Sequence, residues 1–278
     1  MTGGRGPVYN AAMLLRLVVL LFALLSLADD AVGQRRRGWI DRSQYPTWTI
    51  DPEFSGDVFT FARIEFTSYD RFGGWRNDYP DCDWNFSFRL QQLTSMKVDP
   101  DGVTLRLTDP RLNDYPFIYF SNVNNIQLDD REVATLRHYL LNGGFMMADD
   151  FWSAGSWRHV YAQMKRVFPD REPRELTRDH PIFHIVYDIQ GKPQVPSLDQ
   201  WRRGYLVERH HGDMEGDEDP HFQAFFDDDD HVVALLCHNN DIGDGWEREG
   251  EEQEYFSTYS EKLSFPLGIN IVTYALTH

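Results

Sequence analysis

Apolar residues along the chain recur at spacings that alternate between those of strands and those of helices. The segment DVFTFARIEF, residues 57–66, predicts the first strand, and NFSFRLQQLTSM, residues 85–96, predicts a helix. Two further strands are expected at GVTLRLTD, residues 102–109, and at YPFIYFSNV, residues 115–123, the second of them covered on both faces. The core positions expected in the first two elements are Phe59, Phe61, Ile64, Phe66, Phe86, Leu90 and Leu93.

The next elements carry clear boundary signals. Asp129, followed three residues later by Glu132, predicts a capping box at the start of a helix over residues 128–144, which a glycine pair ends. The strand FMMADD follows directly, and residues 153–169 predict another helix with apolar residues at helical spacing.

The pattern weakens from residue 170 to about residue 230, which indicates an acidic, loop-rich insert. Residues 231–237 predict a last buried strand, and residues 264–278 predict a closing helix with Ser264 as its N-cap. Strands that alternate with helices over most of the length favour an α/β fold with a flavodoxin-like, doubly wound parallel sheet. We therefore expect one α/β domain over residues 58–278.

Polar residues directly follow four of the expected strands. Ligands of doubly wound sheets bind beyond the carboxyl ends of the strands, so these residues are expected to form one rim. Its members are Thr67 to Asp70, Ser121, Asn122, Asp149, Asp150 and His238 to Asp241. The sequence therefore predicts a ligand site on this rim.

Composition narrows the class of partner. The formal net charge of −17 at pH 7 argues against a nucleic acid or an anionic membrane surface as the main partner. The two cysteines, Cys82 and Cys237, are too few for a disulfide framework and lack metal-ligand spacing, although a bridge between them stays open for an exported protein. We expect no cofactor.

The first 33 residues have the features of an export signal. Arg5 and Arg16 precede the apolar run LVVLLFALLSL at residues 17–27, which ends in small residues that a signal peptidase reads. The 11 residues of this run are too few to span a hydrocarbon core of roughly 30 Å. We expect an exported protein of the periplasm or cell envelope, either cleaved or transiently attached to the membrane by this run, with residues 34–57 as a linker.

Five stretches in order resemble the bacterial domain-of-unknown-function family 4159. They are DYPFIYFSN, LRHYLLNGGFMMADDFW, DHPIFH, HNNDIGDGWE and PLGINIVTYALTH, and the resemblance covers roughly Phe59 to His278. It implies a fold similar to the class I glutamine amidotransferase and trehalose-utilisation-like superfamily. It also implies gene neighbourhoods with AAA-type ATPases and von Willebrand factor-like domains, which favour an assembly role. The family has no established activity, so the resemblance carries over no catalytic residues.

Amidotransferase chemistry is not expected from this resemblance. In that superfamily a cysteine nucleophile follows the strand at the place of FMMAD, and a later strand ends in a histidine with a glutamate two residues on. The corresponding positions resemble Asp149, with Asp150 beside it, and His238 with Asn240. Because neither the thiol nor the carboxylate that orients the imidazole is evident, we do not expect glutamine amidotransfer.

Asp149 and Asp150 have a structural and a functional interpretation. Adjacent side chains on an extended backbone point to opposite faces, so these two are not automatically a catalytic pair. In the structural interpretation they accept backbone N–H groups or cap the following helix. In the functional one, at least one of them is a ligand contact or a general base, with His238 as its partner.

The segment HNNDIGDGWE is expected to form a tight loop that its two glycines permit. Asp241, Asp244 and Glu247 could accept hydrogen bonds from sugar hydroxyls or hold a cation, with Trp246 as a stacking face. The alternative is an Asx-turn loop stabilised by its own side chains.

Two other groups are weaker candidates. The stretch GGWRNDYPDCDW interleaves three aromatic rings with three aspartates, which suits a carbohydrate or a basic peptide but favours a lid packed over the sheet edge. His180 and His184 have a zinc-like spacing, but Pro181 favours a turn that packs Ile182 and Phe183. We expect no bound metal.

The sequence thus predicts a ligand-binding or scaffolding component of the bacterial cell envelope that recognises a polar small molecule, a glycan or an envelope protein. The candidate ligand-binding residues are Asn122, Asn240, Asp241, Asp244, Trp246 and Glu247. The alternative is a hydrolase acting on a glycan or another polar envelope substrate, with catalytic candidates Asp149, Asp150 and His238. A metal-dependent sensor would require three or more oxygen or nitrogen ligands that converge on one point.

Overall fold

The computed structural model describes residues 41–54, 56–69, 74–207 and 218–278. The expected export signal at residues 1–33 lies outside the described residues. The chain divides into two compact units, Met1–Gln44 and Tyr45–His278, of which the first has one described element, the 3-10 helix Arg42–Gln44. No helix in the described ranges is long and apolar enough to cross a membrane.

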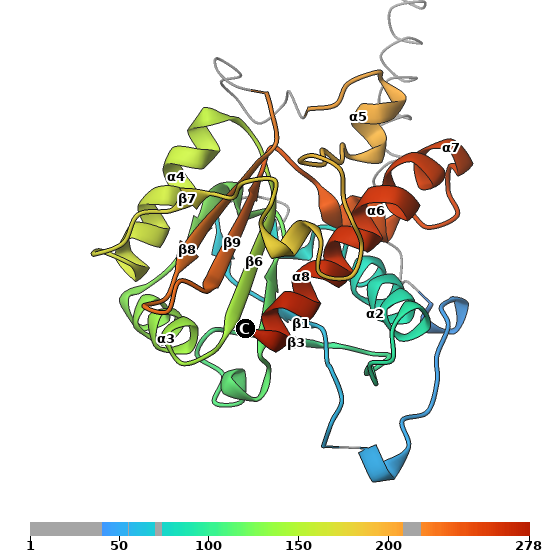
Figure 1. Ribbon diagram of the computed structural model, residues 1–278, viewed down its shortest axis with the longest axis horizontal. Helices are drawn as coiled ribbons and strands as arrows, with labels where there is room; N and C mark the ends of the chain where they lie inside the picture. The colour runs from blue at the N-terminus through green and yellow to red at the C-terminus, as the bar shows by residue number, and fades with distance from the viewer. Residues whose placement is uncertain (1–40, 55, 70–73, 208–217) are drawn as a thin grey trace, which may run out of the picture. The chain divides into compact units, whose positions relative to one another are not determined.

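A seven-stranded sheet forms the centre of the second unit, in the order β3-β1-β4-β6-β9-β8-β7 (Figure 1). The first five strands in this order are parallel, whereas β8 runs antiparallel to both of its neighbours. The strands are β1 (Ala62–Ile64), β3 (Val103–Leu105), β4 (Phe117–Phe120), β6 (Phe145–Phe151), β7 (Arg174–Glu175), β8 (His221–Phe226) and β9 (Val232–His238). A separate antiparallel pair joins β2 (Thr67–Ser68) to β5 (Ile126–Gln127). The expected α/β fold with a mostly parallel, flavodoxin-like sheet is therefore present.

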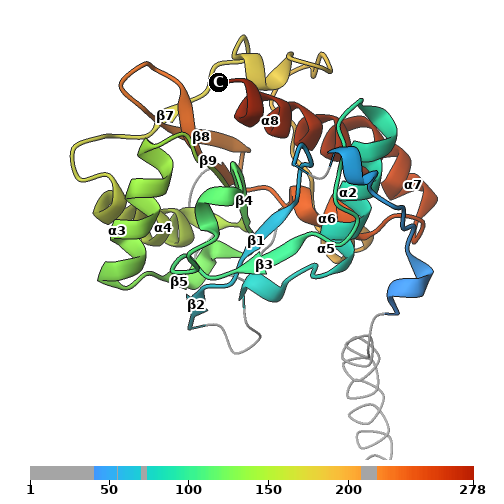
Figure 2. The same cartoon turned by 90° about the horizontal axis from the view of Figure 1, so that it is seen from below.

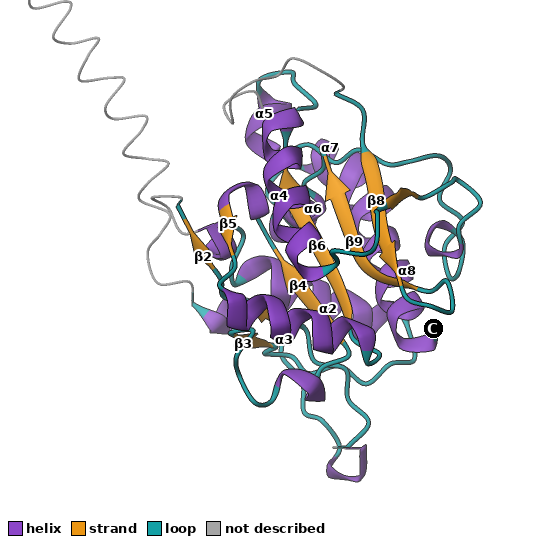
Figure 3. Ribbon diagram, turned by 90° about the vertical axis from the view of Figure 1, so that its left-hand side faces the viewer, coloured by secondary structure: helices purple, strands orange, loops and turns teal. Residues whose placement is uncertain are grey.

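Helices cover both faces of this sheet (Figures 2 and 3). On one face lie α2 (Asp81–Leu93), α6 (Ile242–Glu247) and α8 (Phe265–Thr277), and on the other lie α3 (Asp130–Leu141) and α4 (Ser153–Val167). The central strand β4 serves both layers, because Phe117 and Tyr119 enter the first core while Ile118 and Phe120 enter the second. Its complete burial confirms the prediction of a strand covered on both sides.

Shorter helical elements connect these layers. They are η2 (Pro52–Phe54), η3 (Gly74–Arg76), η4 (Leu112–Asp114), η5 (Val123–Asn125), η6 (Pro181–Phe183), α5 (Leu198–Arg202), α7 (Gln253–Tyr255) and the π-helix Phe256–Ser264. The turn expected around Pro181 is confirmed as η6, with Ile182 and Phe183 fully buried.

The capping signals read from the sequence are confirmed at α3. The Asp129 carboxylate accepts from the Glu132 N–H at 2.8 Å, and the Glu132 side chain accepts from the Asp129 N–H at 2.9 Å. Gly143 adopts a φ of +93° shortly after the last helical residue. One core position was wrong, because Leu93 is the last residue of α2 and is 49% exposed.

Three local predictions were wrong. The insert expected from about residue 170 to 230 contains β8, whose Phe222 and Ala224 enter one core while Phe225 enters the other. The closing helix α8 begins at Phe265 as expected, but Ser264 does not cap it, because a π-helix over Phe256–Ser264 leads directly into it. Instead of capping, the Ser264 hydroxyl donates to the Ile242 carbonyl at 2.5 Å. The expected loop after β9 is the helix α6.

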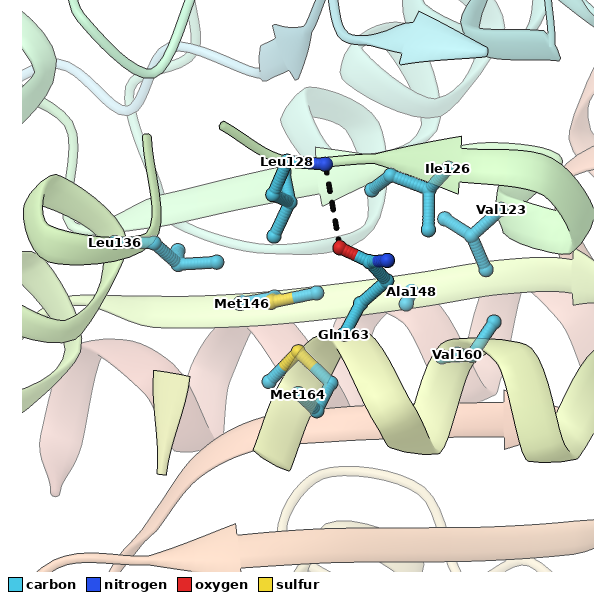
Figure 4. A pocket seen from close by; sticks show the side chains of 9 residues that line it. All are labelled: Val123, Ile126, Leu128, Leu136, Met146, Ala148, Val160, Gln163 and Met164. Carbon is cyan, nitrogen blue, oxygen red and sulfur yellow. Dashed lines mark hydrogen bonds between the residues drawn. The ribbon is translucent and has the colours of Figure 1, made fainter. Parts of the chain in front are cut away.

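A small apolar pocket lies between β6 and α4, where side chains from both elements point toward one hollow (Figure 4). Its one polar lining residue, Gln163, accepts from the Leu128 N–H at 3.3 Å. The free space is about 10 Å³, roughly what a single water molecule needs. We therefore regard this pocket as a packing gap.

Candidate functional site

The carboxyl end of β6 is irregular at Asp149 and Asp150. The pairing of β6 with β9 shifts register between Ala148 and Phe151, and Asp150 adopts a left-handed backbone with φ of +53°. Aspartate tolerates this conformation better than most residues. The charges of both carboxylates contribute, after burial, to a raised pKa of Asp241.

Six carboxylates meet at this edge of the sheet, and we call them the acidic cluster. Its members are Asp78, Asp149, Asp150, Asp241, Asp244 and Glu247. Ligand oxygens of Asp78, Asp150 and Asp241 all lie within 4.8 Å of one another, and those of Asp78, Asp244 and Glu247 do so as well. The first five members are buried, so their charges are largely removed from water.

Only one of the two carboxylate oxygens of Asp149 accepts hydrogen bonds among the described residues. Its Oδ2 accepts from the Gly243 N–H at 2.8 Å and from the Tyr119 hydroxyl at 3.3 Å. Its Oδ1 is buried and has no hydrogen-bond partner among the described residues. Burial raises the pKa of Asp149 to about 7, while the hydrogen bonds from Gly243 and Tyr119 limit the rise. This carboxyl group therefore changes protonation near neutral pH.

Asp150 joins β6 to the loop before α2. Its Oδ2 accepts from the Asn77 side-chain amide at 2.7 Å, and its Oδ1 accepts from the Trp152 indole N–H at 3.1 Å. The Asn124 amide donates to the Asp150 carbonyl at 3.2 Å, which supports the left-handed backbone. Both anchoring amides, Asn77 and Asn124, were missed in the sequence because neither directly follows a core strand.

Asp241 and Asp244 combine structural contacts with membership of the cluster. Asp241 caps α6 by accepting from the Asp244 N–H at 2.9 Å. Asp244 accepts from the Leu198 N–H at 2.6 Å and from the Tyr255 hydroxyl at 3.3 Å. Burial, followed by the charges of Asp150 and Asp78, raises the pKa of Asp241 well above its usual range. The Asp241 carboxyl group therefore favours binding a proton or a cation.

The two glycines of α6 allow close packing and do not form the tight turn that was expected. A Cβ atom on Gly243 would lie 2.5 Å from the Tyr119 hydroxyl oxygen and 3.2 Å from Asp78 Oδ2. A Cβ atom on Gly245 would lie 2.6 Å from the Ser264 side chain. Gly243 therefore lets α6 approach Tyr119 and Asp78, and Gly245 lets it approach Ser264.

Arg248 partly neutralises one end of the cluster. Its Nε lies 2.6 Å from Glu247 Oε2 and 3.3 Å from Asp244 Oδ1. Burial raises the pKa of Glu247 to about 8, with Arg248 lowering it and Asp244 raising it further. The Asp244 and Glu247 end therefore has a protein counter-charge.

Asp78 is the main residue that the sequence analysis did not single out. It has a φ of +59° and is 8% exposed, and its Oδ2 has no hydrogen-bond partner in the described part of the chain. Burial, then the charges of Glu247 and Asp244, raise its pKa well above the usual range. The available signal was its place in GGWRNDYPDCDW, where it was one of three aspartates in an expected lid.

A buried arginine fixes the loop that carries Asp78. Arg63 donates from Nη1 to the carbonyls of Trp75 and Asn77, each at 3.0 Å. Its Nε and Nη2 bind the Asp83 carboxylate at 2.5 to 3.0 Å. The side chains of Arg63 and Asp83 are 0% and 4% exposed. This ion pair therefore ties β1, α2 and the Asp78 loop together.

Other predicted ligand residues serve the fold. Asn240 accepts from the Val195 N–H and donates to the Pro193 carbonyl, so both ends of its amide are used. Trp246 is a correction to the expected stacking face, because it is fully buried with its ring centroid 4.4 Å from that of Phe86. Asn122 adopts a φ of +50°, and its Oδ1 accepts from Asn124 at 3.0 Å.

His238 packs against the start of α4 and against two aromatic rings. His238 Nε2 lies 3.0 Å from the Ser153 carbonyl oxygen, and its ring contacts Phe151 and Trp157. Asp149 instead contacts α6 and β4, through Gly243 and Tyr119.

The remaining histidine and cysteine candidates have separate environments. His184 contacts the Asp188 carboxylate and the Arg178 carbonyl, whereas His180 caps η6 through Nδ1. Cys82 and Cys237 are both buried and free, so the disulfide considered above is not formed.

One family match was found by comparison with known proteins. The family described as "Domain of unknown function (DUF4159)" matches residues 60–276. The match covers most of the chain, which therefore belongs to this family. No curated protein matches the chain.

Proposed function

We propose that this member of the DUF4159 family is a ligand-binding domain whose site is the acidic cluster at the carboxyl edge of the sheet. The observation that carries the proposal is Asp78 Oδ2, which is buried and has no hydrogen-bond partner in the described part of the chain. An unpartnered buried charge costs stability, so a role in function is a physical reason for its presence. Ionised carboxylates only accept hydrogen bonds, so the ligand must supply positive charge or donors.

The proposed setting is the bacterial cell envelope. The export features of residues 1–33 support this location. Ligands there that match an acceptor-only site include amine-bearing glycans and muropeptides, and basic segments of envelope proteins. The same chemistry supports a scaffolding role, in which the ligand is a protein partner.

A hydrolase acting on a glycan or similar envelope substrate is the second candidate. The specific observation in its favour is Asp149, because a pKa of about 7 suits a general base near neutral pH. The His238 ring nitrogen Nε2 contacts the Ser153 carbonyl, whereas Asp149 contacts Gly243 and Tyr119. Binding therefore remains the better supported function.

We also propose, from the resemblance and the parallel sheet, that the fold is related to the class I glutamine amidotransferase-like superfamily without its activity. Amidotransfer requires an exposed, activated thiol. Cys82 and Cys237 are fully buried, and burial raises the pKa of both thiols well above the usual value. Neither cysteine is suited to act as that nucleophile.

A thermal-shift screen of the chain against organic amines, sugars, muropeptides and divalent cations tests the binding proposal. Asp149→Asn and Asp241→Asn are suitable variants, since asparagine retains an oxygen acceptor for the Gly243 N–H and also caps helices well. We expect at least one ligand to raise the wild-type melting temperature by several degrees and to have little effect on either variant.

The matched control is Asp114→Asn, because Asp114 is exposed and precedes β4, at the opposite end of that strand from the cluster. It should respond to the ligand as the wild type does. A ligand that stabilises all four chains equally would place binding outside the acidic cluster and count against the proposal.

A further inference from the structure

Three carboxylates of the acidic cluster have the spacing of ligands around one ion. Oxygens of Asp78, Asp150 and Asp241 all lie within 4.8 Å of one another. Calcium binds oxygen at about 2.3–2.6 Å, so two of its ligands are at most about 5 Å apart. One ion can therefore contact all three side chains with little rearrangement.

The state of Asp78 is a second and independent indication of a ligand. Asp78 is more than nine-tenths buried, yet its Oδ2 receives no hydrogen bond from the described residues. Each of the other two already accepts a hydrogen bond, Asp150 from Asn77 and Asp241 from the Asp244 N–H. Carboxylate oxygens have two lone pairs, so these bonds orient Asp150 and Asp241 without preventing coordination.

The second group of three, which Asp78 shares with Asp244 and Glu247, is a poorer site for an ion. Arg248 lies 3.3 Å from Asp244 and 2.6 Å from Glu247, and its guanidinium already supplies positive charge there. Arg248 also pairs with Glu251. The Asp78, Asp150 and Asp241 group is therefore the stronger candidate.

We infer that one hard divalent cation, of the class of Ca²⁺, Mg²⁺ and Mn²⁺, binds between Asp78, Asp150 and Asp241. This inference rests on the proposed function and names the ligand class of the same site. A donor set made only of carboxylate oxygens favours these ions over zinc or copper, which prefer nitrogen and sulfur. Three side chains do not complete the coordination of such an ion, so it keeps positions for water or for oxygen atoms of a polar ligand.

Equilibrium dialysis of the chelator-treated full chain at pH 8, against each of the three ions separately, tests the inference. We expect one ion per wild-type chain for at least one of the three, and affinity at least tenfold lower for Asp78→Asn and for Asp150→Asn. The exposed-site variant Asp114→Asn should bind as the wild type does. Circular dichroism spectra that match the wild type show that a variant has folded.

Two outcomes would overturn the inference. Equal affinity in wild type and Asp78→Asn would place the ion elsewhere on this acidic chain. If none of the three ions binds while an amine or glycan still stabilises the wild type and not Asp241→Asn, the metal inference is wrong. The proposed ligand site would then still stand. If no ion and no organic ligand binds, both the metal inference and the proposed ligand-binding function are wrong.

Discussion

Asp83→Ala is expected to lower the free energy of unfolding by about 3–5 kcal/mol, the usual cost of breaking a buried ion pair. The substitution leaves Arg63 charged and fully buried, without the carboxylate that binds its Nε and Nη2. The two carbonyls that Nη1 contacts cannot neutralise the guanidinium. Urea denaturation with linear extrapolation measures the loss.

The control for this prediction is Asp228→Ala, which removes an exposed partner of Arg171. It should unfold at the wild-type urea concentration, because exposed ion pairs contribute little. The double variant Arg63→Met/Asp83→Leu should recover part of the stability, since it removes both buried charges. If Asp83→Ala unfolds like Asp228→Ala, the buried ion pair does not hold β1 to α2.

Raising the pH from 5 to 7 with a chelator present is expected to destabilise the chain by on the order of 3 kcal/mol. Burial raises the pKa of Asp149 from 3.8 to about 7. Between these values the folded chain holds a proton that the unfolded chain has released. The contribution of this proton to the free energy of unfolding is complete below pH 3.8 and is lost as the pH rises through about 7. Glu247, with a pKa of about 8, extends the loss toward pH 8.

Urea denaturation across this pH range measures the effect, with Asp149→Asn as the comparison. The variant has no titrating group at this position, so its stability should fall less steeply with pH. The series should be repeated at high salt, because salt screens repulsion between surface charges much more than interactions in the buried cluster. Equal slopes in wild type and Asp149→Asn would show that Asp149 does not carry the pH dependence.

Much of the layered fold is predictable because the signals are local. The apolar run at Phe117–Phe120 and the Asp129 capping box depend on neighbouring residues, and both predictions are confirmed. Helix α6 was missed because glycine normally weakens helices. Gly243 is there for a non-local reason, since a side chain would collide with the Tyr119 hydroxyl on β4. No pattern within α6 reveals that contact.

The site was only partly predictable for a similar reason. The rule that ligands bind at strand ends led to Asp149, Asp150 and Asp241, which the structure places in one cluster. Asp78 comes from a loop before α2, and it reaches the cluster because Arg63 binds the carbonyls of the preceding residues. Such long-range contacts cannot be read from spacing. Trp246 was assigned to a surface because its burial depends on α2, which is distant in the sequence.

The most direct test of the acidic cluster as a functional site is the unfolding free energy of Asp78→Asn, measured with a chelator at pH 8. We predict that this variant is more stable than the wild type, because the amide cannot ionise. Ionisation of the buried Asp78 carboxyl group, whose Oδ2 has no hydrogen-bond partner among the described residues, costs stability. Asp83→Asn should have the opposite sign, since Asp83 pairs with Arg63. An Asp78→Asn chain that is less stable than the wild type would show that the carboxylate supports the fold, and would contradict the account.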